Sequence, residues 1–194
     1  MASFDLAVEK TLKWEGGKTT DTGGFTNFGI SQNAYPNLDI EHLTRDGAKA
    51  IYRRDYWDAL ALDKVGDQAS AAAMFDFAVN AGLSRARTEA QAALLAAGIA
   101  SDKGAALVDS MNRMGAAFAS ALTNRRIAFY RGLAAKNPSK YGQYLTGWEK
   151  RAKSFFSGAS GIAQGLAGSK ITWVILAAAI GGGYWYYKKR IKRA

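Results

Sequence analysis

Apolar residues recur every three or four positions in several stretches of the chain, and this spacing predicts amphipathic helices. The first such stretch covers residues 3–15, where Ser3 is a suitable N-cap and Gly16–Gly17 ends the pattern. Residues 67–82 are apolar nearly all round, which is typical of a central buried helix. Helices with one apolar face are expected at 45–57, 85–97, 115–135 and around 147–151. The pattern therefore predicts a mainly α chain.

The helical pattern is interrupted directly after the first predicted helix. Residues 18–30 are too rich in glycine and threonine for a helix, and Asp21-Thr22-Gly23-Gly24 is a turn signal. Alternating polar and apolar residues flank this turn. We therefore expect a small β-hairpin or an extended loop directly after the first helix.

The last residue of the first helix is the strongest candidate for chemistry. Glu15 falls on the apolar side of the helix, at its C-terminal end. Partial burial and the negative end of the helix dipole both favour a protonated carboxyl group, which a general acid requires at neutral pH. The alternative is a solvated glutamate in the last turn before a glycine cap.

Four further residues are candidates for contact with a ligand. Asp76 and Asn80 lie four positions apart, so they share one face of the buried helix. Polar groups there must find partners or line a cleft, and the hairpin backbone is the alternative partner to a substrate. Tyr56 and Trp57, at the end of the 45–57 helix, have rings that either stack on a sugar or belong to the core.

Composition excludes several kinds of site. The chain has no cysteine and one histidine, which excludes disulfides, thiolate zinc sites, a cysteine nucleophile and zinc sites built on two histidines. We expect no metal and no cofactor, and a peptidase or amidase is disfavoured. The histidine, His42, precedes a candidate helix cap at Thr44, so we place it on a surface loop.

Four motifs follow one another along the chain. They are Glu15-Gly16-Gly17 with Asp21-x-Gly23-Gly24-x-Thr26-Asn27-x-Gly29-Ile30, then Ile51-Tyr52 with Tyr56-Trp57, then Phe75-Asp76-x-Ala78-Val79-Asn80-x-Gly82, and finally Gly147-Trp148-x-x-Arg151. In this order they resemble glycoside hydrolase family 108, which comprises peptidoglycan muramidases of phage lysins and bacterial secretion activators. The segment after Glu15 is also similar to the Glu–Asp–Thr hairpin of tailed-phage lysozymes, although Lys18-Thr19-Thr20 replaces a longer family loop.

The resemblance implies a lysozyme-like helical domain that cleaves the β-1,4 bond between N-acetylmuramic acid and N-acetylglucosamine. Glu15 would protonate the leaving oxygen, and Asp21 or Thr26 would position water or stabilise the oxocarbenium-like state. Trp148 is expected to pack the last helix onto the core, with glycan binding as the alternative.

Net charge and hydropathy change towards the C-terminus. Of the net charge of +10, six positive charges lie in residues 170–194. Residues 157–169 are small and flexible, which indicates a linker after a catalytic domain at 1–156. Residues 171–187 carry no charge, end in the aromatic run Tyr184-Trp185-Tyr186-Tyr187 and are followed by basic residues, so 170–194 is predicted to be a transmembrane helix with a basic tail. A surface-lying cationic tail and a buried core helix are the alternatives.

These features predict a single-pass membrane protein that binds peptidoglycan and a lipid bilayer. The basic tail would stay cytoplasmic, so the catalytic domain would face the periplasm or cell wall. The N-terminus does not resemble a signal peptide. A phage lysis protein working with a holin, a virion-borne lysin and a bacterial protein all fit.

Two other functions remain open. A lytic transglycosylase would cut the same bond with one glutamate and no water. A membrane effector, holin-like or secretion-activating, would use its enzymatic activity only secondarily. Nucleic-acid binding is disfavoured, because the basic tail adjoins an apolar segment rather than a folded face.

Overall fold

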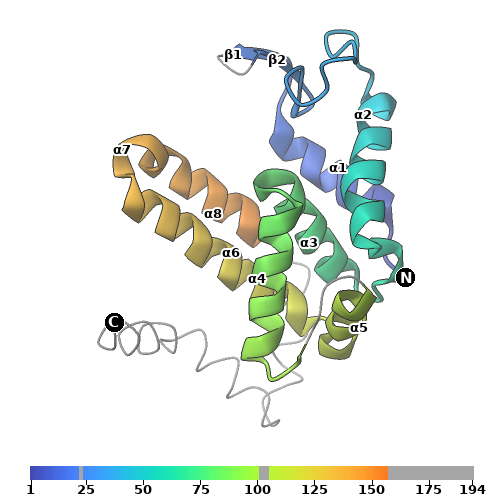
Figure 1. Cartoon of the computed structure of the whole chain (residues 1–194), viewed down its shortest axis with the longest axis vertical. Coiled ribbons are helices and arrows are strands. Elements are labelled where there is room, and N and C mark those ends of the chain that lie inside the picture. Colours follow the sequence, from blue (N-terminus) through green and yellow to red (C-terminus); the bar gives the residue numbers. More distant parts are fainter. Residues whose placement is uncertain (22–23, 101–104, 157–194) are drawn as a thin grey trace.

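The computed structural model describes residues 1–21, 24–100 and 105–156, and this part is mainly helical with a small three-stranded sheet (Figure 1). The α-helices are α1 (Phe4–Glu15), α2 (Arg45–Tyr52), α3 (Gln68–Ala81), α4 (Leu83–Ala96), α5 (Ala105–Met114), α6 (Ala117–Lys136), α7 (Pro138–Tyr141) and α8 (Leu145–Ser154). The strands are β1 (Thr19–Asp21), β2 (Gly24–Asn27) and β3 (Ile30–Ser31). A π-helical turn, η1 (Arg53–Trp57), and the 3-10 turns η2 (Asp58–Leu60), η3 (Leu62–Lys64) and η4 (Gly142–Tyr144) complete the described elements.

Local signals set the helix ends. The Ser3 side chain caps α1 by accepting a hydrogen bond from the backbone N–H of Leu6. The Thr44 side chain caps α2 in the same way, by accepting a hydrogen bond from the backbone N–H of Gly47. The helix expected at 45–57 is α-helical only as far as Tyr52, and it continues to Trp57 as the π-helical turn η1. The helix expected from residue 85 begins at Leu83 instead, directly after Gly82.

Helix α3 is the centre of the domain, as its apolar sequence predicts. It packs against α1, α4 and α6, and in Figure 1 it lies between α1 and α2 on one side and α6 and α8 on the other. Phe75 and Phe77 are fully buried, and each such side chain contributes roughly 1.5–3 kcal/mol by leaving water. The helix that carries Glu15 and helix α6 therefore pack on one common element, and the last helix, α8, packs on α6.

The predicted hairpin is confirmed, and a third short strand extends it. The sheet is antiparallel in the order β1-β2-β3, with Thr26 opposite both Thr19 and Ser31. The turn between β2 and β3 consists of Phe28 and Gly29, whose φ angles are 52° and 78°. Two successive positive φ angles are typical of the tight turn that joins two twisted strands.

The predicted linker (157–169) and transmembrane segment (170–194) lie outside the described residues. Within 1–21, 24–100 and 105–156, every helix is too short or too polar to cross a bilayer.

Candidate active site

Glu15 ends helix α1, and its side chain is only 15% exposed. Gly16 follows with φ of 70°, so the chain leaves the helix at once and turns into the sheet. A solvated last-turn glutamate would be far more exposed. The alternative interpretation of Glu15 as an ordinary surface residue therefore does not hold.

The β2–β3 turn lies directly against the Glu15 carboxylate. A Cβ atom added at Gly29 would overlap with Oε2 of Glu15 and with the hydroxyl of Tyr52. The same hydroxyl donates a hydrogen bond to the carbonyl of Phe28 at 2.7 Å, which fixes the turn from its other side. Glycine is therefore required at position 29 for two reasons, its positive φ and the close approach of the carboxylate.

An arginine from the far end of the chain holds the other side of the carboxylate. Nη2 of Arg151, in α8, donates to Oε1 of Glu15 at 2.5 Å, and the same guanidinium binds both oxygens of Asp76 at 2.8–3.1 Å. Burial alone would lower the pKa of Arg151, but the bonds and charge of Asp76, and then of Glu15, outweigh it and raise the pKa. Arg151 is therefore a fixed positive charge between two carboxylates.

Asp76 anchors this arrangement from helix α3. Its side chain is fully buried, and Nη1 of Arg126 also donates to its Oδ2 at 2.7 Å. Both carboxylate oxygens are thus bound by guanidinium groups. The sequence predicts that Asp76 contacts either substrate or the hairpin backbone. The structure instead pairs it with Arg126 and Arg151 and leaves none of its side chain exposed.

The remaining polar contacts of this group lead to Asn80. Nε of Arg126 donates to the Tyr130 hydroxyl at 2.7 Å, and this hydroxyl donates to Oδ1 of Asn80. Burial raises the pKa of Tyr130, which keeps its hydroxyl protonated and able to donate. The side-chain oxygen of Asn80 already accepts the hydrogen bond from Tyr130. Because Asn80 is partly exposed, it remains a candidate for substrate contact.

The other two predicted catalytic residues belong to the hairpin. Thr26 lies in β2, three residues before Gly29, and is held between Thr19 and Ser31 in the sheet. The backbone of Asp21 ends β1 opposite Gly24, and its side chain lies outside the described part of the structure. The sheet thus brings the Thr26 backbone to the same turn that contacts Glu15.

Two aromatic residues at the end of the 45–57 helix have different surroundings. Tyr56 is partly exposed, and its pKa is raised by burial first and by the charges of Asp55 and Glu15 next. Its ring lies 5.9 Å from the ring of Tyr52, whose hydroxyl holds the Phe28–Gly29 turn beside Glu15, so Tyr56 remains a candidate for substrate contact. Trp57 is fully buried, makes edge contacts with Phe4 and Phe75, and donates from Nε1 to Asp63. Its ring belongs to the core rather than to a sugar-binding surface.

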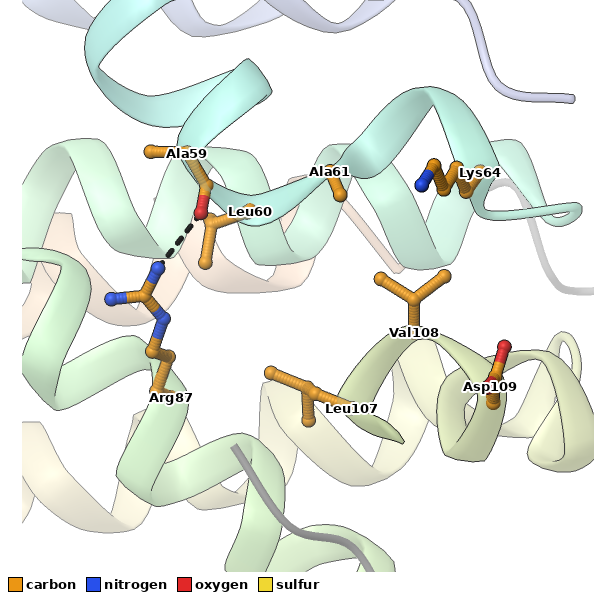
Figure 2. A pocket seen from close by; sticks show the side chains of 8 residues that line it. All are labelled: Ala59, Leu60, Ala61, Lys64, Arg87, Leu107, Val108 and Asp109. Atoms are coloured by element: carbon orange, nitrogen blue, oxygen red, sulfur yellow. Dashed lines mark hydrogen bonds between the residues drawn. The ribbon is translucent and has the colours of Figure 1, made fainter. Parts of the chain in front are cut away.

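A cavity of about 250 Å³ lies elsewhere in the fold, between η2, η3, α4 and α5 (Figure 2). Apolar side chains line most of it, and Arg87 closes one edge by donating to the carbonyl of Ala59 at 2.8 Å. None of its lining residues contacts Glu15 or Arg151. The chemistry of the site therefore does not depend on this cavity.

The roles of Arg151, Arg126 and Gly29 are not predicted from the sequence. Arg151 belongs to the Gly147-Trp148-x-x-Arg151 motif, in which the sequence predicts a role only for Trp148. A signal was present: Trp148, Arg151 and Phe155 recur at helical spacing, which puts an arginine among the apolar positions of the last helix. A buried arginine needs a buried acid, and Asp76 was the available one. His42 lies on an exposed loop beside Asp39, as predicted.

This chain resembles a known family and a solved structure. The family model described as glycosyl hydrolase 108 matches residues 8–82, which include Glu15, the sheet and Asp76. The solved structure of Brucella abortus SagA is 26% identical, and the match covers 81% of this chain and 94% of that chain with a TM-score of 0.65. A search of curated proteins found no match. The chain therefore resembles the glycosyl hydrolase 108 family over residues 8–82, and it is a glycoside hydrolase that acts on peptidoglycan.

Proposed function

We propose that the protein is an N-acetylmuramidase that cleaves the β-1,4 bond between N-acetylmuramic acid and N-acetylglucosamine, with Glu15 as its general acid. The observation that carries this proposal is the setting of Glu15. Its side chain is mostly buried, lies at the end of a helix, and is held between the Phe28–Gly29 turn and Arg151.

In the proposed reaction Glu15 gives its proton to the leaving glycosidic oxygen. Arg151 lies against the carboxylate and balances the negative charge that remains on it after proton transfer. Asp76 holds the guanidinium in place, so this charge does not have to be ordered during the reaction. Thr26 or Asp21, on the hairpin, positions the water that attacks the sugar.

A zymogram against purified peptidoglycan tests the assignment of Glu15. The Glu15→Gln variant keeps the shape of the side chain but has no acidic proton, so clearing should fall by about 10²–10⁴-fold, the usual contribution of a general acid. Glu9→Gln is the matched control, because Glu9 lies on the same helix and its side chain is 44% exposed. Equal clearing by Glu15→Gln and Glu9→Gln would overturn the assignment.

Mass spectrometry of the products distinguishes hydrolysis from transglycosylation. A muramidase leaves a reducing muramic acid end that carries the added water. A lytic transglycosylase leaves an anhydro end, and finding that end would replace the hydrolase proposal. Leakage of dye from lipid vesicles that persists in Glu15→Gln would instead favour a membrane effector.

The proposal includes a membrane tether through residues 171–187. A helix of this length spans about 26 Å, near the lower limit for a hydrocarbon core. With the basic tail inside, the catalytic domain would face the periplasm or cell wall, as a phage-type lysis protein working beside a holin requires.

The tether is tested by alkaline extraction of membranes from cells that express the full chain. Leu176→Arg puts a charge in the middle of the proposed span and should release the protein, because such a charge costs roughly 2.5–3.5 kcal/mol on insertion. Leu166→Arg, in the proposed linker, is the matched control and should leave the protein membrane-bound. Retention of Leu176→Arg would contradict a span.

A further inference from the structure

A cluster of aromatic rings lies beside the candidate active site and has no role in the chemistry proposed above. Trp148, in α8, contacts the rings of Tyr130, Tyr141 and Tyr144 at centroid distances of 5.0, 6.1 and 5.6 Å. The Tyr144 and Trp148 rings are stacked, with an interplanar angle of 29°. The cluster thus joins α6, α7, η4 and α8.

The buried part of the cluster, at Tyr130, packs the last helices together. The exposed part, at Tyr144, is not accounted for by this packing. Tyr130 is 2% exposed and is part of the core. Tyr144 is 51% exposed, whereas most aromatic residues of the described chain are buried or half-buried. A large ring held flat against its neighbours while half of it faces solvent is preorganised to bind a ligand, since little freedom is lost on binding.

The position of the cluster connects it to Glu15. Trp148 and Arg151 are three residues apart on α8, so they lie on one side of the helix, and Arg151 contacts Glu15 directly. Tyr144 is seven residues before Arg151, which is roughly 10 Å along the helix. In Figure 1 α7 and the start of α8 lie on the left of the upper half of the molecule, and the β1–β2 hairpin lies at its top. A glycan strand that passes Glu15 and continues along α8 would reach these rings.

Charge around the cluster suits the same ligand. The ammonium of Lys140 lies 5.2 Å from the centroid of the Tyr141 ring and is exposed. Pyranose rings present C–H faces that pack on aromatic rings, and the lactyl and peptide groups of peptidoglycan carry carboxylates that a lysine attracts.

We infer that the Tyr141–Tyr144–Trp148 cluster is a glycan-binding subsite, which packs a sugar of the peptidoglycan strand on the Tyr144 ring at a distance from the bond that is cut. This inference rests on the proposed function. It assigns to the start of α8 a share of substrate affinity that is separate from catalysis at Glu15.

The test measures binding of the full chain to purified peptidoglycan by co-sedimentation, in the Glu15→Gln background so that the polymer stays intact. Tyr144→Ser removes the ring and should weaken binding about two- to tenfold, the range of a single ring contact. Tyr144→Phe keeps the ring and should bind like the parent. Leu95→Ala, at another exposed apolar residue, is the control and should also bind like the parent.

Equal binding by Tyr144→Ser and Leu95→Ala would overturn the subsite, and so would equal losses in Tyr144→Ser and Tyr144→Phe. In the active chain Tyr144→Ser should raise KM by the same factor and leave kcat unchanged, and a fall in kcat alone would also overturn it. These readouts are independent of the zymogram. A failed Glu15 assignment therefore stays distinguishable from a failed subsite.

Discussion

Helix α1 carries two glutamates, Glu9 and Glu15, that form ion pairs with basic side chains, and the surroundings of the two glutamates differ sharply. Glu9 is 44% exposed and pairs with Arg45 and Lys49 of the neighbouring helix α2. Glu15 is 15% exposed and pairs with Arg151, which is 136 residues away in the sequence. The first pair is a surface contact between consecutive helices, whereas the second joins both ends of the domain through Asp76.

This difference predicts how each group responds to substitution. An exposed ion pair gains little, because water screens its charges and the long side chains lose freedom when they pair. A buried group is costly to break, because removing one member leaves another charge buried without a partner. The predictions below test this contrast, from the largest expected effect to the smallest.

Asp76→Ala should have the largest effect on stability. It removes the acid that neutralises two buried guanidinium groups, of Arg126 and Arg151, so the free energy of unfolding should fall by about 3–5 kcal/mol. Denaturant titration measures this loss. Asp109→Ala, at an exposed position of α5, is the control. A loss below about 1 kcal/mol for Asp76→Ala would contradict the anchoring role.

Arg151→Lys should affect activity more than stability. Lysine keeps the positive charge but cannot bridge Glu15 and Asp76 with a planar set of donors. We expect kcat to fall by up to about 100-fold through misplacement of Glu15, with KM little changed. Arg131→Lys, in an exposed pair with Glu149, should leave kcat unchanged. Equal rates for the two variants would show that Arg151 does not position Glu15.

Gly29→Ala tests the close approach of the β2–β3 turn to Glu15. The matched control is Gly98→Ala, because Gly98 has nearly the same φ, +74° against +78°, but nothing within 4 Å of an added Cβ. Both variants should lose about 1 kcal/mol of stability from the positive φ. Gly29→Ala alone should also lower kcat, by roughly tenfold, through displacement of the carboxylate. Similar kcat values would argue against a tight fit.

Glu9→Gln should have the smallest effect, visible mainly as a change in pH dependence. Hydrogen bonds from Lys49 and Arg45 lower the pKa of Glu9 from 4.5 in the folded protein. The pair therefore stabilises the fold above about pH 4.5, and this contribution is lost as the pH falls through the lower folded value. Denaturant titrations from pH 6 to pH 3 should show a slightly flatter profile in Glu9→Gln. An unchanged profile would mean that the pair adds nothing.

Most of the helices could be predicted because their signals are local. The apolar residues of α3, the caps at Ser3 and Thr44 and the turn signal after Asp21 each act within a few positions of the sequence. Glu15 could be found for the same reason, since the glycine break and the hairpin motif follow it at once. The burial of Trp57 could not be decided from the sequence, because a ring at helical spacing looks the same whether it faces the core or a sugar.

The sequence by itself determined the helical class, the hairpin after α1 and the candidate acid at its start. Only the tertiary structure decided what holds that acid. Arg151 reaches Glu15 because α1 and α6 pack on α3 while α8 packs on α6, and no local pattern encodes a contact over 136 residues. The physical reason is burial, because a guanidinium and two carboxylates excluded from water must satisfy one another wherever the packed helices bring them together.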